Sequence, residues 1–94
     1  MNEEKILTRH PDGKKGVNIL ARRYDQIKDY ILARLRENGE MSYRALDEMA
    51  NKDLAGKFDG RISWYVISVK LDLEARKVIE RIPGSSPQVI RLKK

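Results

Sequence analysis

Apolar side chains recur at helical spacing between residues 20 and 38 of the chain. They are Leu20, Tyr24, Ile27, Ile31 and Leu35. Steps of three and four residues place these side chains on one face, which predicts a helix with a single buried stripe. Asn38-Gly39 follows the last of them, and glycine readily takes the left-handed conformation at a helix C-terminus. The helix is therefore expected to end there.

A second helix is predicted to begin at Ser42 and to end near Gly56. Ser42 is a good N-cap residue, and Met41 before it can pack against Leu46 inside the helix. Its inner side is expected to carry Leu46, Met49, Ala50 and Leu54. Residues 39–55 have a net charge of −2, so this helix is poorly suited to lie along phosphates.

The third predicted helix spans residues 60–76 and carries apolar side chains on two faces. One stripe consists of Ile62, Tyr65, Val66, Val69 and Leu73, and the nearly opposite one of Trp64, Ile67 and Leu71. Most surface helices bury one face, so the second stripe is expected to meet the N-terminal segment, a partner chain or a ligand. Asp59 is expected to cap this helix.

An antiparallel hairpin is predicted at the C-terminal end of the chain. Side chains alternate in residues 78–82 and again in residues 88–92, as is typical of strands. The segment between them, residues 83–87, contains two prolines and a glycine, which force the chain to reverse.

The N-terminal residues 1–19 are predicted to form an extended arm, ahead of one domain at residues 20–94. Residues 6–8 and 16–19 flank the turn sequence Pro11-Asp12-Gly13. These two short pieces either pair as a hairpin or wrap the domain. Lys14-Lys15 lies beside the turn, and a solvated loop is favoured there over a phosphate contact.

Composition and charge narrow the class of protein. The 94 residues include 24 Val, Ile, Leu and Phe, which is enough for one folded domain with a modest core. Cysteine is absent, which excludes disulfides and thiolate metal sites. No apolar run is long enough for a membrane span or signal peptide, so a cytoplasmic location is predicted.

The positive charge is unevenly spread along the chain. The net charge is +6, and residues 78–94 alone contribute +3. Such a surplus permits attraction to nucleic acid without demonstrating it, since basic residues also serve solubility. The C-terminal third is nevertheless expected to be the basic end of the molecule.

The predicted order of elements resembles a winged helix-turn-helix domain: helix, helix, longer helix and then a hairpin. The closest resemblance is to the junction between recognition helix and wing in MarR-type repressors, carried here by residues 73–84, Leu-Glu-Ala-Arg-Lys-Val-Ile-Glu-Arg-Ile-Pro-Gly. Residues 64–66 and 69–75 are also similar to a small bacterial family of uncharacterised domains. The resemblance implies an α+β fold with three helices, a C-terminal β-hairpin wing and an N-terminal extended arm.

The resemblance also implies double-stranded DNA as a partner and assigns residues to its binding. Positions on the third helix and wing that would contact DNA, together with the basic C-terminus, are Arg61, Ser63, Ser68, Arg81, Ser85, Ser86, Arg91, Lys93 and Lys94. Trp64, Ile67 and Leu71 fall on the same reading face, yet bases are read by polar side chains. A second departure is Lys77, where the resembled junction has glycine. Lys77 is therefore expected to leave the helix without the left-handed conformation, which costs a non-glycine residue about 1 kcal/mol.

Three large apolar groups on one helix face form a patch that soluble monomers usually cover. The chain's own residues 1–20 are the favoured cover for Trp64, Ile67 and Leu71, followed by a second subunit of a homodimer. Insertion as a wedge into nucleic acid is the third alternative.

Residues that carry enzyme chemistry are missing from the sequence. His10 is the only histidine and lies in a polar turn, so it is expected to be a surface residue. The carboxylates of Asp47, Glu48 and Asp53 are interpreted as surface charge, and no glycine-rich phosphate loop is present. We therefore expect no enzyme, no metal and no cofactor. The leading hypothesis is a DNA-binding transcriptional regulator. The alternative is a winged-helix scaffold for protein association through Trp64, Ile67 and Leu71.

Overall fold

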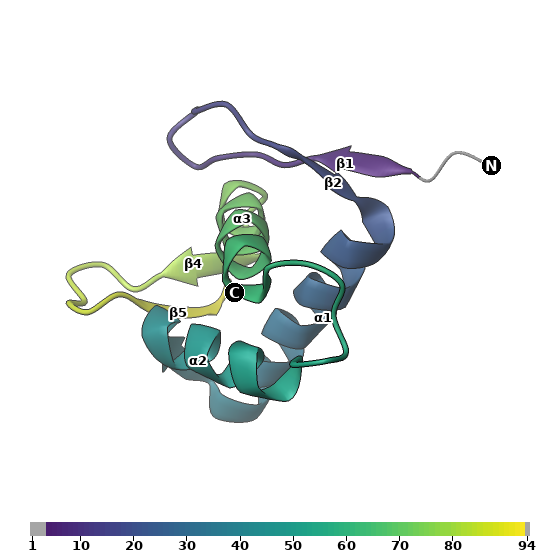
Figure 1. The fold of residues 1–94 in the computed structure, drawn as a ribbon. Coiled ribbons are helices and arrows are strands. Elements are labelled where there is room, and N and C mark those ends of the chain that lie inside the picture. The colour runs from purple at the N-terminus through teal and green to yellow at the C-terminus, as the bar shows by residue number, and fades with distance from the viewer. Residues whose placement is uncertain (1–3, 94) are drawn as a thin grey trace.

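The computed structural model describes residues 4–93, which form an α+β architecture of three helices and two small antiparallel sheets. The elements are β1 Lys5–Leu7, β2 Asn18–Leu20, α1 Ala21–Asn38, β3 Glu40–Ser42, α2 Tyr43–Asp53, α3 Ile62–Ala75, β4 Ile79–Arg81 and β5 Val89–Leu92. The first sheet pairs β1 with β2, and the second has the strand order β3-β5-β4. In the view of Figure 1, α3 lies between the two sheets.

The predicted stripe of α1 is buried, with one exception at its start. The buried side chains of the helix are Tyr24, Ile27, Ile31 and Leu35. The prediction was wrong for Leu20, which ends β2 and is only partly buried. Its backbone pairs with Lys5 across the first sheet, so helical geometry begins one residue later. Gly39 follows the helix with a φ of 79°, the left-handed region expected there.

The start of α2 is confirmed, and three of its four predicted core residues are buried. Ser42 Oγ accepts a hydrogen bond from the backbone N–H of Ala45 at 3.0 Å. Leu46, Ala50 and Leu54 are buried, but Met49 is 37% exposed. Successive helical residues differ in direction by about 100°, so with Ala50 facing inward its neighbour Met49 lies at the edge of the buried face.

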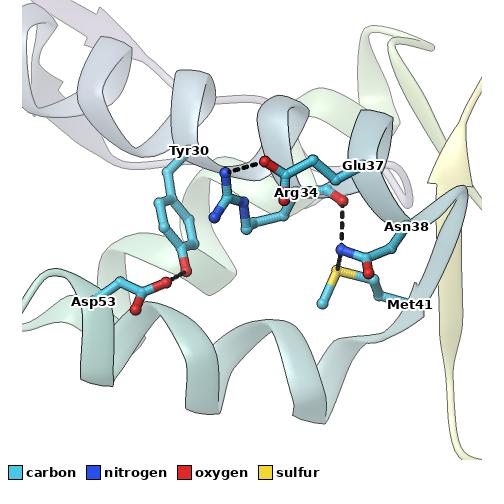
Figure 2. A network of polar contacts seen from close by, with 6 residues as sticks. All are labelled: Tyr30, Arg34, Glu37, Asn38, Met41 and Asp53. Atoms are coloured by element: carbon cyan, nitrogen blue, oxygen red, sulfur yellow. Dashed lines mark hydrogen bonds and ion pairs between the residues drawn. The ribbon is translucent and has the colours of Figure 1, made fainter.

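Polar contacts join α1 to the C-terminal end of α2 and to β3, which precedes α2 (Figure 2). Tyr30 Oη on α1 donates a hydrogen bond to Asp53 Oδ2 at the end of α2, at 2.7 Å. Near the other end, Asn38 Nδ2 donates to the backbone oxygen of Arg34 at 2.9 Å and lies 3.6 Å from Met41 Sδ. Burial raises the pKa of Tyr30, and the hydrogen bond to Asp53 adds to this effect. The tyrosine therefore remains a donor at neutral pH.

Three of the five residues predicted for the inner stripe of α3 are buried, Ile62 and Tyr65 are partly buried, and the predicted cap is not formed. Val66, Val69 and Leu73 are almost completely inaccessible to solvent. The prediction for Asp59 was wrong: Arg61 occupies the N-cap position, and no side chain caps the helix. Asp59 instead forms an ion pair with Arg23 of α1. This pairing joins the segment before α3 to α1.

The exit from α3 also differs from the prediction. Lys77 has a φ of 63° and is the only non-glycine residue with positive φ among residues 4–93. The N–H of Val78 then donates to the oxygen of Leu73 at 2.9 Å, and that of Lys77 to Glu74 at 3.1 Å. These hydrogen bonds satisfy carbonyl groups at the helix end and offset the cost of the left-handed lysine.

The three-stranded sheet contains a strand that the sequence pattern did not indicate. β4 pairs antiparallel with β5, with Glu80 opposite Arg91. β5 also pairs antiparallel with β3, with Met41 opposite Ile90. β3 has only three residues, and the last of them is the Ser42 cap of α2. We call β4, β5 and the loop between them the C-terminal hairpin.

The N-terminal segment forms a hairpin rather than a wrapped arm. β1 pairs antiparallel with β2, and the N–H of Thr8 donates to the oxygen of Val17 at 2.8 Å beyond the strands. Ile19 is buried within the main core, so this hairpin packs on the helices. We call residues 5–20 the arm hairpin. Figure 1 shows its loop passing over one end of α3.

Candidate functional site

Two of the three polar side chains predicted to read DNA on α3 lie against neighbouring elements of the protein. Ser63 Oγ donates to Asp47 Oδ2 at 3.1 Å and accepts from Asn51 Nδ2 at 2.9 Å, which ties α3 to α2. Ser68 lines a small cavity of about 80 Å³ between α3 and the arm hairpin. Arg61 is exposed at the start of α3. Of these three side chains, Arg61 is the one freely available to a ligand.

The predicted residues of the C-terminal loop divide into structural and exposed groups. Ser85 Oγ donates to the oxygen of Ile82 at 2.7 Å and accepts from the N–H of Val89 at 3.0 Å, so it shapes the loop. Ser86 and Arg81 are exposed.

The basic residues predicted on β5 and after it are paired with a single carboxylate. Arg91 Nε lies 2.8 Å from Glu80 Oε2, and Lys93 Nζ lies 3.1 Å from Glu80 Oε1. The hydrogen bonds from Arg91 and Lys93 lower the pKa of Glu80, which keeps it charged. Lys94 lies outside the described residues. The positive charge of the C-terminal hairpin is therefore partly neutralised within it.

The apolar outer stripe of α3 is covered at one end only. Leu71 lines the small cavity beneath the arm hairpin, together with Thr8 and Val17. Trp64 is 43% exposed, and its ring meets Tyr65 edge-on with centroids 4.9 Å apart. Ile67, between them in sequence, is partly buried. Self-coverage by the N-terminal segment thus holds for Leu71 and does not extend to Trp64.

A larger hollow opens between the arm hairpin and the C-terminal end of α3. Its volume is about 560 Å³, and it is lined on one side by residues of the arm loop and on the other by Glu74, Ala75 and Lys77. We call it the arm hollow. Its charged and potentially charged lining residues are Arg9, His10, Lys14, Lys15, Glu74 and Lys77.

Four of these side chains are cations without an ion-pairing partner. Within residues 4–93, neither Arg9, Lys14, Lys15 nor Lys77 forms a salt bridge, and all four are exposed. The carboxylate of the hollow, Glu74, is paired with a cation of its own.

That partner is Lys70, which lies one helical turn earlier and is 1% exposed. Burial lowers the pKa of Lys70, an effect that the contact with Glu74 opposes. Lys70 thus balances the charge of Glu74. The four cations then give the hollow its positive charge.

A buried carboxylate fixes the arm loop in place over α3. Asp72 is fully inaccessible to solvent; its Oδ1 accepts from the backbone N–H of Arg9 at 2.8 Å. Its Oδ2 accepts from Tyr24 Oη on α1 and from Arg76 Nε, the latter at 2.8 Å. Burial, with the hydrogen bond to Asp72, raises the pKa of Tyr24. One carboxylate therefore joins the arm hairpin, α1 and the end of α3.

A known protein family matches nearly the whole chain. Residues 5–90 match DUF6958, a family of unknown function. The chain belongs to DUF6958. No curated protein and no solved structure matches it. The DUF6958 match includes every residue that lines the arm hollow and ends just before Arg91.

The arm hollow of this DUF6958 chain was not predicted from the sequence. Lys14-Lys15 was expected in a solvated loop and His10 at the surface, and all three line the hollow. Both lysines are solvent-exposed as expected. The sequence does show Arg9, Lys14 and Lys15 grouped around a turn. Lys77 joins them only in the folded chain, so the sequence pattern does not indicate it.

Metal and membrane sites have no support in the described part of this DUF6958 protein. Among residues 4–93, no three acidic, histidine or cysteine side chains gather as a metal ion would require. No helix in that range is long and apolar enough to cross a bilayer. The expectations of no metal, no cofactor and a cytoplasmic location remain predictions.

Proposed function

We propose that the chain is a winged helix-turn-helix domain. Its support is the order of elements, in which β3 lies between α1 and α2, and α3 is followed by β4 and β5. A three-stranded sheet ordered β3-β5-β4 brings β3 beside the C-terminal hairpin, and we assign this hairpin the place of the wing. Lys77 in the left-handed conformation fits the position where MarR-type junctions have glycine.

We further propose that this domain is a non-enzymatic DNA-binding module and acts as a transcriptional regulator. The observation that carries the proposal is the convergence of Arg9, Lys14, Lys15 and Lys77 at the end of α3. These unpaired cations come from segments about sixty residues apart in sequence and provide a compact positive surface. Lysine and arginine contacts to phosphates supply most of the affinity of such modules.

The proposed binding mode relies on phosphate contacts more than on base reading. Ser63 is hydrogen-bonded to α2 and Ser68 faces the arm hairpin, so α3 offers few side chains that match base edges. Arg61 and Arg81, both exposed, extend the cationic surface beyond the arm hollow. Affinity is therefore expected to depend strongly on salt and weakly on sequence.

The test is a titration of the protein with two duplexes of unrelated sequence at about 50 mM and about 200 mM salt. If four phosphates are neutralised, affinity falls about a hundredfold between the two salt concentrations, with similar values for both duplexes. Absence of binding at the lower salt concentration would reject DNA binding. A single preferred duplex would reject the phosphate-based mode and favour reading by α3.

A second candidate function is protein association through the uncovered end of α3. Trp64 is the observation in its favour, because it is 43% exposed while the arm hairpin reaches only Leu71. Exposed tryptophans are common anchors of protein interfaces. Sedimentation of Trp64→Ser tests it, with Met49→Ser as the matched control because Met49 is an exposed apolar residue of α2. Association predicts a lower mass for Trp64→Ser alone; an unchanged mass rejects self-association.

A further inference from the structure

The arm hollow has the dimensions of a site for a small organic molecule. Its volume of about 560 Å³ lies within the range of roughly 300–1,000 Å³ found for ligand pockets. A bare inorganic anion would fill a small part of it. In Figure 1 the loop of the arm hairpin overhangs the end of α3. Residues of both segments line the hollow.

The charge of the hollow selects an anion. Arg9, Lys14, Lys15 and Lys77 bring four positive charges to its rim, and the Glu74 carboxylate is already balanced by Lys70. Mutual repulsion among these cations is relieved by a ligand with at least two negative charges. Hydrogen bonds from lysine and arginine to phosphate oxygens are charge-assisted and short, and are stronger than bonds between neutral groups.

The rest of the lining selects an organic body. Leu7 is 61% exposed and lines the hollow together with Pro11 and Ala75. Burial of apolar ligand surface against these side chains contributes about 25 cal/mol per Å². A ligand with an apolar group beside its charged group would use both kinds of wall.

The walls are held in place before any ligand arrives. Thr8 Oγ1 accepts from the N–H of Val17 at 2.9 Å, and the N–H of Arg9 is fixed to Asp72. His10 closes the turn: its oxygen accepts from the N–H of Gly13 at 3.0 Å, and its Nδ1 from that of Asp12 at 3.1 Å. A rigid loop loses little entropy on binding, and the His10 ring keeps Nε2 as a further donor.

We propose that the arm hollow binds a small phosphate monoester with an apolar organic group. Its phosphate lies among Lys14, Lys15, Arg9 and Lys77, and its organic group lies against Leu7 and Pro11. This inference goes beyond the proposed DNA binding and does not require it. It predicts that ligand and duplex compete wherever they share these cations.

The probes are phenyl phosphate, inorganic phosphate and phenol, each titrated into the protein and followed by NMR of its backbone amides. Phenyl phosphate is expected to bind at least about threefold more tightly than inorganic phosphate, through apolar contact, and phenol is expected not to bind. The largest amide shifts are expected in residues 8–16 and 74–78. Equal affinity for the two phosphates, or shifts centred elsewhere, would overturn the proposal.

Two variants test the cations, with a matched control. Lys14→Gln/Lys15→Gln is expected to weaken phenyl phosphate binding about tenfold or more. Lys77→Gly removes a third cation while relieving the left-handed backbone, so a loss of binding there cannot be attributed to unfolding. Lys52→Gln/Lys57→Gln makes the same charge change at exposed positions outside the hollow and is expected to leave affinity unchanged.

The proposed site would be rejected if Lys52→Gln/Lys57→Gln lost as much affinity as Lys14→Gln/Lys15→Gln. The effect would then be due to net charge alone. These measurements contain no nucleic acid. Failure of ligand binding would therefore leave the DNA-binding proposal standing, and failure of the duplex titration would leave this one standing.

Discussion

The two hairpins of the molecule use similar basic residues in opposite ways. In the C-terminal hairpin, Arg91 and Lys93 both contact Glu80. In the arm hairpin, Arg9, Lys14 and Lys15 have no ion-pair partner among residues 4–93 and stand around an open hollow. In the view of Figure 1 the loops of both hairpins extend to the left, on either side of α3.

This contrast shows that net charge along a sequence does not locate the cations that lack an ion-pair partner. Residues 78–94 have a charge of +3 and residues 1–21 only +1, which suggests that the C-terminal end is the cationic one. Among residues 4–93 the structure reverses this order for cations without an ion-pair partner, because Arg91 and Lys93 both contact Glu80. In the arm hairpin, by contrast, no acidic residue among residues 4–93 forms an ion pair with Arg9, Lys14 or Lys15.

The largest expected effect comes from removing the anchor of the arm hairpin. Asp72→Ala deprives three donors, on Arg9, Tyr24 and Arg76, of a fully buried acceptor. Breaking such a buried network costs about 3–5 kcal/mol, measured as the free energy of unfolding in urea. Hydrogen exchange is expected to accelerate first in residues 5–20.

Asp29→Ala on the exposed side of α1 is the control and should change stability by less than about 0.5 kcal/mol. If Asp72→Ala proves equally mild, the arm hairpin is held by other contacts.

The next effect is a gain of function in the C-terminal hairpin. Glu80→Gln releases Arg91 and Lys93 from their carboxylate, so duplex affinity is expected to rise about fivefold at low salt. Glu48→Gln is matched, since it frees Arg44 of α2 from a similar ion pair with the same change in net charge. An equal rise in both variants would mean that total charge, and not the position of the cations, governs binding.

A stabilising change is expected at the end of α3. Lys77 has a φ of 63°, and glycine adopts that conformation without the steric cost of a β-carbon. Lys77→Gly should raise the free energy of unfolding by about 1 kcal/mol, seen as a rise of about 4–8 °C in Tm. A lower Tm would show that the lysine side chain contributes more than its backbone costs.

The smallest expected effects concern the pH dependence of stability, which is predicted to differ between the two hairpins. The pKa of Glu80 is lowered in the folded state, so its contribution is present above the unfolded pKa and is lost as pH falls through the folded value. The pKa of Tyr24 is raised, so its contribution is complete below about pH 10 and is lost as pH rises.

Amide exchange should accordingly increase in residues 79–93 on the acid side and in residues 5–20 on the alkaline side. Absorbance of tyrosinate should show Tyr24 protonated until the fold is lost. The reverse pattern would contradict the assigned anchors.

Helices and their buried stripes could be predicted because they depend on local spacing. The stripe from Tyr24 to Leu35 and the cap at Ser42 followed directly from residue types. β3 could not be predicted, because three residues carry no alternation and one of them already serves as the cap. The role of Asp59 was missed for another reason: its ion pair with Arg23 depends on how α1 packs.

The candidate site was less accessible to sequence reasoning than the fold. Ser63 and Ser85 have the right chemistry for DNA, but their hydroxyl groups are occupied by neighbours that only the folded chain supplies. Conversely, Lys77 joins Lys14 and Lys15 because Asp72 holds the arm loop over α3. No spacing rule connects residues this far apart.

The most direct test of the central claim compares the two hairpins in one duplex-binding measurement. Lys14→Gln/Lys15→Gln and Arg91→Gln/Lys93→Gln each remove two positive charges. The arm variant is expected to lose about tenfold or more in affinity at low salt, and the C-terminal variant distinctly less. A larger loss for Arg91→Gln/Lys93→Gln would contradict the account and return the binding surface to the C-terminal hairpin.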